Sequence, residues 1–236
     1  MRFDILTLFP DIFGGYLKES ILNKAIERNL VEVYLHNIRD WARDKHKSVD
    51  DRPYGGGPGM VMMVDVVVEC VEAVRGMASP DGRLIMLTPQ GRRWSQPLVE
   101  RTAKEEARIL LLCGRYEGFD ERIRLILEPD EISIGDFVLN GGEVAAMAIV
   151  DSVIRLIPGV LGAEESSGND SFSGPNRLLE FAQYTRPRIF RGFETPPILL
   201  GGNHEKIAKW REQNSLERTR RRRADLLGAE EERVSE

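Results

Sequence analysis

The segment RILLLCG, residues 108–114, carries five consecutive apolar residues and ends at a glycine. A second segment, RLIMLT at residues 83–88, has the same character and is followed by Pro89. Neither segment alternates apolar with polar residues, so we expect two strands that are buried on both faces. Such strands are typical of parallel sheets that are covered by helices on both sides.

The flanking segments alternate between strand and helix patterns. We expect further strands at residues 3–9, 31–37 and 131–135, and helices at residues 10–28, 65–77, 95–106 and 143–156. This alternation predicts an α/β fold with a mostly parallel sheet and helices on both faces. With 42% hydrophobic residues in 236, the chain can bury one sizeable core and form a small second domain.

The C-terminal part has a different composition. Residues 163–176, AEESSGNDSFSGPN, are small and polar and predict a flexible linker. Residues 177–236 contain two helical stretches, at about 204–214 and 215–227, and no strand pattern. The sequence therefore predicts a domain at residues 1–162, the linker, and a small all-α C-terminal domain.

Charge is distributed unevenly along the chain. Residues 1–162 hold 20 Lys and Arg against 25 Asp and Glu, whereas residues 177–223 hold 12 against 5. A basic block beside an acidic body favours a polyanionic partner. The alternative is an ordinary solvated surface, which composition alone does not exclude.

The two cysteines and the N-terminal residues indicate the cellular compartment of the protein. Cys70 and Cys113 lie in apolar runs, which predicts buried thiols in a reducing compartment. The first residues do not form a secretory signal, and no apolar run reaches the roughly 20 residues that span a bilayer. These features predict a cytoplasmic protein without a membrane partner.

Four glycine-rich turns occur at residues 55–59, 89–91, 114–118 and 135–142. The last three follow predicted strands, so they are expected at the carboxyl edge of the sheet, where α/β proteins bind ligands. Glycine lets main-chain groups approach a nucleoside closely, although each turn taken alone is more often only a turn. The turns lack the spacing of a phosphate-binding loop, and three scattered histidines form no zinc pattern. A nucleoside triphosphate site and a zinc site are therefore disfavoured.

Glu117 lies in one of these turns, directly after a predicted strand. Its carboxylate can accept hydrogen bonds from a base edge or favour a nearby sulfonium cation. The alternative interpretation is a surface glutamate that pairs with Arg115 or Arg122.

Seven segments stand out in a fixed order along the chain. They are DDRPYGGGPGM (50–60), LTPQGR (87–92), CGRYEGFDER (113–122), SIGDFVLNGGE (133–143), AMAIVDSVIRLIPGVLG (146–162), NDSF (169–172) and YTRP (184–187). In this order they resemble the bacterial tRNA (guanine-N1)-methyltransferase family of the SPOUT class. The resemblance starts at FDILTLFP and covers nearly the whole chain. It implies a deep trefoil knot near the end of the α/β domain, which the strand and helix pattern alone does not predict.

The resemblance also implies where the methyl donor, S-adenosylmethionine, binds. The residues implied to hold it lie in three knotted loops and are Leu87, Thr88, Pro89, Gly91, Gly114, Tyr116, Glu117, Gly118, Ser133, Ile134, Gly135, Asp136, Phe137, Val138, Leu139, Gly141 and Gly142. A homodimer with each active site at the subunit interface is implied as well. Magnesium is implied as a requirement, but the sequence predicts no fixed metal site.

The implied reaction is methylation of guanine N1 in tRNA at the guanosine immediately 3′ of the anticodon, a modification that supports reading-frame maintenance. Guanine N1 carries a proton that a carboxylate can remove, and negative charge then develops on O6. The resemblance assigns Asp170 as this base, Arg155 as the cation at O6, and Glu117 as a contact to the guanine edge. The basic residues able to contact tRNA phosphates are Lys206, Lys209, Arg211, Arg218 and Arg220–Arg223.

Three positions depart from the family pattern: Met86 replaces an aromatic residue, Ala145 replaces Pro and Phe137 replaces Tyr. Because of Met86 and Ala145, the sequence does not predict which side chains pack around the adenine.

Two other functions also remain to be considered. One is a tRNA- or ribosome-binding protein without activity, which the presence of Asp170, Arg155 and the glycine turns disfavours. The other is a SPOUT enzyme for ribosomal RNA or a ribose hydroxyl, and a ribose needs no base that deprotonates a ring nitrogen.

Overall fold

The computed structural model describes residues 1–161 and 170–228, in two compact units. Unit 1 is Met1–Gly162 and unit 2 is Ala163–Glu236. Residues 163–169 of the predicted linker lie outside the described residues, as do residues 229–236. Each unit is described by itself below.

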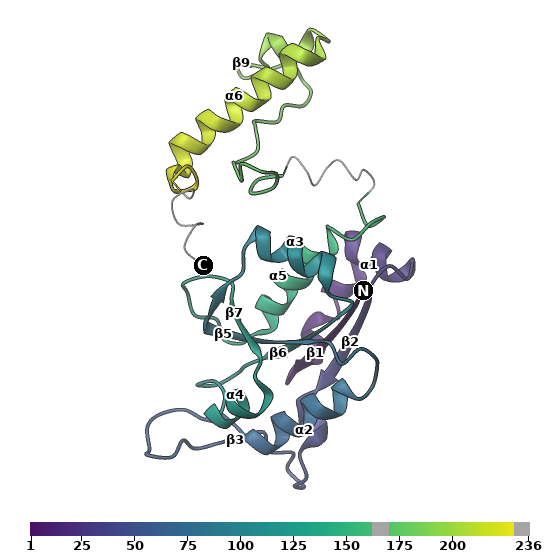
Figure 1. Ribbon diagram of the computed structural model, residues 1–236, viewed down its shortest axis with the longest axis vertical. Helices are drawn as coiled ribbons and strands as arrows, with labels where there is room; N and C mark the ends of the chain where they lie inside the picture. The colour runs from purple at the N-terminus through teal and green to yellow at the C-terminus, as the bar shows by residue number, and fades with distance from the viewer. Residues whose placement is uncertain (162–169, 229–236) are drawn as a thin grey trace. The chain divides into compact units, whose positions relative to one another are not determined.

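A parallel sheet forms the centre of unit 1 (Figure 1). Among the described residues, five strands pair in the order β2-β1-β6-β5-β7, and every pairing is parallel. Their bounds are β1 Arg2–Thr7, β2 Glu32–Asn37, β5 Arg83–Arg93, β6 Arg108–Cys113 and β7 Asp130–Ser133. This confirms the predicted α/β fold with a parallel sheet, whereas the trefoil knot stays a prediction.

Both faces of the sheet are covered by helices, and two hydrophobic clusters result (Figure 1). The first cluster includes side chains from α1 (Ser20–Glu27), α3 (Gln96–Glu105) and α5 (Glu143–Ile154). The second includes side chains from α2 (Val64–Arg75) and α4 (Glu121–Leu127). Successive residues of β6 enter the two clusters in turn, and all six are buried. Burial on both faces explains why the strand shows no polar alternation.

The expected helix at residues 10–28 is wrong in its extent. Two short 3-10 helices, η1 Pro10–Phe13 and η2 Tyr16–Lys18, precede the eight-residue α1. Gly14 and Gly15 separate the two turns, and Glu19 is extended, with φ −118° and ψ 153°. Glycine weakens a helix because it loses the most conformational entropy on folding.

The segment between β2 and α2 contains more structure than the sequence indicated. A 3-10 helix η3 covers Ile38–Trp41, and the short strands β3 (Asp50–Asp51) and β4 (Val61–Met62) pair antiparallel. Met62 N–H also donates to the Gly118 carbonyl oxygen at 2.9 Å. This loop is therefore anchored to the turn that follows β6.

Strand β5 continues beyond the predicted end at Pro89. Its pairing with β7 shifts register between Leu87 and Arg92 and then resumes to Arg93. At Gly91 the two backbones approach so closely that a Cβ would lie 2.3 Å from the Ile132 nitrogen. Only glycine fits at that crossing.

In the described part of unit 2, residues 170–228, a single α-helix, α6 (His204–Arg222), forms where the sequence indicated two. Polar side chains of α6 hold the segment 179–182: Thr219 and Asn214 accept the N–H groups of Leu179 and Ala182 at 3.0 and 2.8 Å. Two short 3-10 helices flank α6, η5 at Pro197–Leu200 and η6 at Ala224–Leu226.

The expectation of no strand in the C-terminal part is also wrong in detail. Ile189–Phe190 (β8) pairs antiparallel with Phe193–Glu194 (β9). Arg191 and Gly192 join the strands with φ of 50° and 83°, as a two-residue hairpin turn requires. Two-residue strands are too short to leave a periodic pattern in the sequence.

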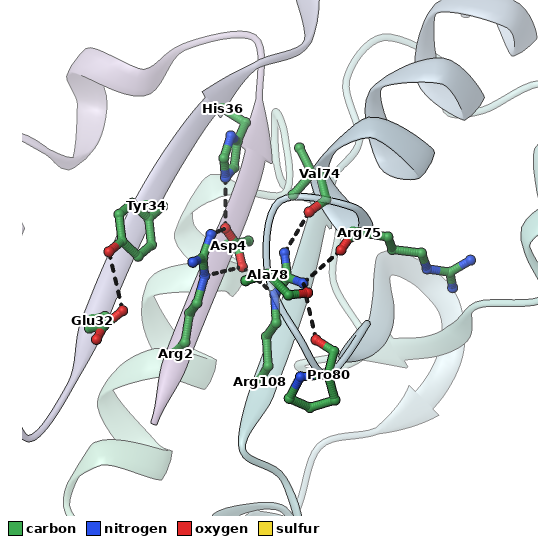
Figure 2. A network of polar contacts seen from close by, with 10 residues as sticks. All are labelled: Arg2, Asp4, Glu32, Tyr34, His36, Val74, Arg75, Ala78, Pro80 and Arg108. Carbon is green, nitrogen blue, oxygen red and sulfur yellow. Dashed lines mark hydrogen bonds and ion pairs between the residues drawn. The ribbon is translucent and has the colours of Figure 1, made fainter.

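A buried ionic network connects β1, β2 and β6 with the end of α2 (Figure 2). The Asp4 carboxylate, fully buried, accepts hydrogen bonds from Arg2, His36 and Arg108, each at 2.8 Å. Burial opposes ionisation of Asp4, but these bonds outweigh it and lower its pKa well below the usual range. Arg108 also donates to carbonyl oxygens of Val74 and Arg75, which closes the C-terminal end of α2.

Replacement of Asp4 should destabilise unit 1 strongly. Asp4→Asn leaves Arg108 buried without its counter-ion, so we expect the free energy of unfolding to fall by about 3–5 kcal/mol in urea denaturation. Arg2→Gln is the control, because Arg2 is partly exposed and its loss should cost about 1 kcal/mol or less. Equal stability of Asp4→Asn and the wild type would contradict a stabilising network.

The pH dependence follows from the direction of the shift. Because the folded pKa of Asp4 lies below its unfolded value of about 3.9, the stabilisation is present above that pH. It should be lost as the pH falls through the folded pKa, and Asp4→Asn should lack this component of acid unfolding.

Candidate functional site

A cavity of about 400 Å³ lies at the carboxyl ends of β5, β6 and β7. Its walls are the second half of β5, which contains the turn predicted at residues 89–91, and the loops that follow β6 and β7. The sequence predicted a ligand site at this edge of the sheet. The expected donor-binding residues that line it are Leu87, Thr88, Pro89, Gly114, Tyr116, Glu117, Gly118, Ser133, Ile134, Gly135, Phe137, Val138, Leu139, Gly141 and Gly142.

Gly91 and Asp136, two residues implied to bind the donor, are not in this lining. Gly91 packs on the β7 backbone as described above. The Asp136 carboxylate is 88% exposed and forms an ion pair with Arg93 at 2.8 Å. Their assignment to the donor has no geometric support within this cavity.

The lining also contains residues that sequence reasoning did not select. They are Gln90, Arg115, Phe119, Glu121, Arg124, Ile132, Asn140 and Ala145. Most are neighbours of predicted residues in the sequence. The sequence therefore located the turns but did not show which side chains of each turn face the cavity.

The three departures from the family pattern have different positions. Met86 is fully buried in the cluster beneath α2 and α4 and does not line the cavity. Ala145 lines the cavity from the first turn of α5. Phe137 is 54% exposed, and its ring fills the space beside Gly135. Met86 therefore has no direct contact with a ligand in this cavity.

Gly142 allows two of the loops to meet. Its N–H donates to the Gly114 carbonyl oxygen at 2.9 Å. A Cβ at Gly142 would lie 2.8 Å from the Cys113 Cα and 3.0 Å from the Gly114 nitrogen. Backbone atoms cannot give way as the end of a flexible side chain can, so this contact requires glycine.

A buried ion pair joins the same two loops. The Glu143 side chain, 1% exposed at the start of α5, accepts hydrogen bonds from Thr7 Oγ1 at 2.8 Å and Arg115 Nε at 3.1 Å. Its second oxygen lies 2.9 Å from the Arg115 guanidinium, an ion-pair distance without hydrogen-bond geometry. A carboxylate at a helix N-terminus is also stabilised by the helix dipole.

Arg115 extends from this ion pair across the opposite loop. Its guanidinium donates to the Asn140 carbonyl oxygen at 3.2 Å and lies 4.5 Å from the centre of the Phe9 ring. A Cβ at Gly141 would approach Arg115 Nε to 2.3 Å. The Arg115 side chain thus holds the turn after β6 against the turn before α5.

Glu117 pairs with neither arginine that the sequence offered as an alternative. Arg115 binds Glu143, and Arg122 forms an ion pair with Asp120 at 2.7 Å. Glu117 instead packs against Gly59, where a Cβ would lie 2.4 Å from its side chain, and its N–H donates to the Met60 carbonyl oxygen. The glycine-rich turn at residues 55–59, which does not line the cavity itself, therefore supports the cavity wall.

Tyr116 has a left-handed backbone, with φ of 60°, in the same turn. Partial burial, followed by a hydrogen bond with Asp50, raises the pKa of its hydroxyl. The phenol therefore stays neutral near pH 7, and its single proton is donated to the Asp50 carboxylate.

Arg155 and Asp170 are the other expected catalytic residues. Arg155 caps the C-terminal end of α5, whereas Ala145 near the other end lines the cavity. Arg155 follows Ala145 by ten residues, or about 15 Å along the helix axis. Asp170 belongs to unit 2, where its carbonyl oxygen accepts the Ser173 N–H at 3.1 Å.

The basic residues proposed for tRNA contact are mostly exposed along α6. Arg218 is an exception, because it is half-buried and donates to the Glu180 carbonyl oxygen at 3.1 Å. Arg223 forms an ion pair with Asp225 at 2.6 Å. These two residues have roles within unit 2 already.

Within residues 1–161 and 170–228, no cluster of three or more His, Cys, Asp or Glu could hold a metal ion. The same residues contain no helix that is long and apolar enough to cross a bilayer.

Comparison of the sequence with known protein families shows the family of this chain. Residues 1–229 match the model of the tRNA (Guanine-1)-methyltransferase TrmD family. This chain belongs to that family. The match spans both units and confirms the resemblance seen in the sequence motifs.

Curated relatives from distant bacteria agree with this membership of the tRNA (guanine-1)-methyltransferase family. A tRNA (guanine-N(1)-)-methyltransferase of Rhodopirellula baltica is 61% identical over 228 residues, 96% of this chain and 94% of the relative. Proteins of the same name from Geobacillus kaustophilus and Geotalea uraniireducens are 57% and 56% identical over 227 residues. These two matches cover 96% of this chain and 91% and 90% of the relatives.

Proposed function

We propose that this protein methylates N1 of guanine in tRNA, at the guanosine immediately 3′ of the anticodon, with S-adenosylmethionine as the donor. The observation that carries the proposal is the cavity formed by three glycine-rich loops in a chain of this family. A cytoplasmic location, where tRNA is found, is part of the proposal.

The cavity suits an adenosine-containing donor. Gly114, Gly141 and Gly142 line it without side chains, so that a ligand can lie close to the backbone, and Leu87, Ile134 and Leu139 supply apolar walls for a ring. S-Adenosylmethionine, when bound, supplies an electrophilic methyl group on a sulfonium. The Glu117 carboxylate lines the same cavity and favours a cation there.

The acceptor is the difficult reactant, because N1 of guanine is protonated at neutral pH. We assign Asp170 to remove this proton, which makes the N1 lone pair available. Arg155 stabilises the negative charge that develops on O6, and Glu117 holds the guanine edge.

We further propose a homodimer in which a second copy completes each site. Arg155 lies about 15 Å along α5 from Ala145, which lines the cavity, so another subunit is the simplest source of this guanidinium. The cavity lining includes exposed apolar side chains, with Val138 84%, Phe137 54% and Leu139 37% exposed. Apolar groups gathered in this way favour a protein interface.

Unit 2 supplies the electrostatic part of tRNA binding in this proposal. Exposed cations on α6 include Lys206 and Arg220–Arg222, which can neutralise phosphates. Affinity for tRNA should therefore fall with salt. Magnesium, which the family resemblance implies, is assigned to the RNA rather than to a protein site.

The experiment is incubation of the full chain with methyl-labelled S-adenosylmethionine and unmodified tRNA transcripts, followed by mapping of the labelled nucleoside. The expected product is 1-methylguanosine at the position 3′ of the anticodon. Label on a ribose, on another base, or in ribosomal RNA only would contradict the proposal.

A further inference from the structure

An exposed hairpin in unit 2 has no role in the function proposed above. It consists of β8 (Ile189–Phe190), the turn residues Arg191 and Gly192, and β9 (Phe193–Glu194). Ile189, Phe190 and Phe193 are 58%, 60% and 82% exposed. Three large apolar side chains on one tight hairpin are costly to leave in water, so this surface suits a ligand.

The hairpin is locally rigid. Phe190 and Phe193 are direct cross-strand partners, so their rings project from the same face. The Arg188 guanidinium forms an ion pair with Glu194 at 2.7 Å, and the Thr195 N–H donates to the Arg188 carbonyl oxygen at 2.9 Å. These contacts stabilise the hairpin backbone, and the strand pairing places both rings on one face before any ligand arrives.

Its charge identifies the class of ligand. The segment YTRPRIFRGF, residues 184–193, contains three arginines and no acidic residue. Every residue from Gln183 to Glu194 is exposed. The Arg191 guanidinium already lies 5.3 Å from the centre of the Phe190 ring. Aromatic rings interleaved with arginines match unpaired nucleotides, which offer flat bases beside phosphates.

We propose that this hairpin binds unpaired bases of the tRNA substrate, with Phe190 and Phe193 stacking on them and Arg191 contacting the adjacent phosphates. The inference rests on the proposed function and specifies which part of unit 2 recognises a loop rather than a duplex. A protein partner is the competing occupant, but an apolar protein face does not require three arginines around the rings.

The test compares two labelled RNAs by fluorescence anisotropy: an anticodon stem-loop, and a blunt duplex with the same number of phosphates. We expect the full-length Phe190→Ala/Phe193→Ala variant to bind the stem-loop at least about tenfold more weakly, with duplex affinity nearly unchanged. Both positions are exposed, so the variant should fold, and circular dichroism checks this.

A leucine pair distinguishes stacking from apolar docking. Phe190→Leu/Phe193→Leu keeps apolar surface but removes the aromatic faces, so it should also lose stem-loop affinity. Ile189→Ala is the matched control, because Ile189 lies on the opposite face of the hairpin and should retain affinity. Arg191→Gln should weaken binding and reduce its salt dependence.

Two results would overturn the assignment. One is stem-loop affinity of the alanine pair within twofold of the wild type. The other is full affinity of the leucine pair together with dimer dissociation of the alanine pair in sedimentation, which would identify a protein interface. A wild-type enzyme that methylates tRNA while the hairpin variants bind normally refutes only this inference. Absence of methylation by the wild type refutes the proposed function itself.

Discussion

Asp170→Asn is expected to slow methyl transfer by about 100-fold or more at saturating substrates, because general base catalysis is typically worth 10²–10⁴. The amide cannot accept the N1 proton, so the guanine lone pair stays unavailable. Donor affinity should be nearly unchanged, because the Asp170 carboxylate is assigned to N1 of the acceptor and asparagine keeps the size of the side chain. Single-turnover methylation with labelled donor measures the rate, and calorimetry measures donor affinity.

The surroundings of Asp170 make this variant interpretable. The turn after Asp170 is held by main-chain bonds, from Ser173 N–H to the Asp170 carbonyl at 3.1 Å and from Phe172 N–H to the Leu178 carbonyl at 2.8 Å. Asparagine preserves both bonds. Asp225→Asn, which removes another carboxylate from unit 2, should retain activity. An unchanged single-turnover rate for Asp170→Asn would show that another group removes the proton.

Gly142→Ala is expected to have the largest effect on donor binding, with affinity reduced by a factor of ten or more. The added Cβ would overlap the backbone at Cys113 and Gly114, so the turn before α5 must move away from the turn after β6. That movement also breaks the 2.9 Å bond from Gly142 N–H to the Gly114 carbonyl. Isothermal calorimetry with S-adenosylmethionine measures the loss.

Substitutions at two other glycines should reduce donor affinity less than Gly142→Ala does. Gly15→Ala should be neutral, because its Cβ would have no neighbour within 4 Å and its φ is −73°. Gly141→Ala should have an intermediate effect, since its Cβ meets the Arg115 side chain, which can shift at the expense of the Glu143 pair. Normal donor affinity in Gly142→Ala would mean that the two loops do not need to meet.

The structure gives Gly141 a different role from the one that the sequence implied. The family resemblance implied that Gly141 holds the donor. In the structure a Cβ at Gly141 would meet the Arg115 side chain, so a larger residue would first displace a guanidinium. Separation by 28 residues hides the Arg115–Glu143 pair from any local pattern.

Local patterns predicted the framework well where the physical constraint was local. The apolar residues of β6 could only be accommodated by burial on both faces, and the observed bounds Arg108–Cys113 match the predicted segment. Helix α4 was missed although Asp120 caps it, since its seven residues are too few for a clear helical period.

The sequence by itself determined the α/β class, the family and the three loops that form the cavity, because strand burial and glycine-rich turns depend on neighbours along the chain. Only the tertiary structure decided which side chains line the cavity and which support it. Arg115 lines the cavity, Glu143 is its buried partner, and Arg155 lies at the far end of α5. The reason is physical: a buried charge is stable only beside its partner, and folding decides which residues become neighbours.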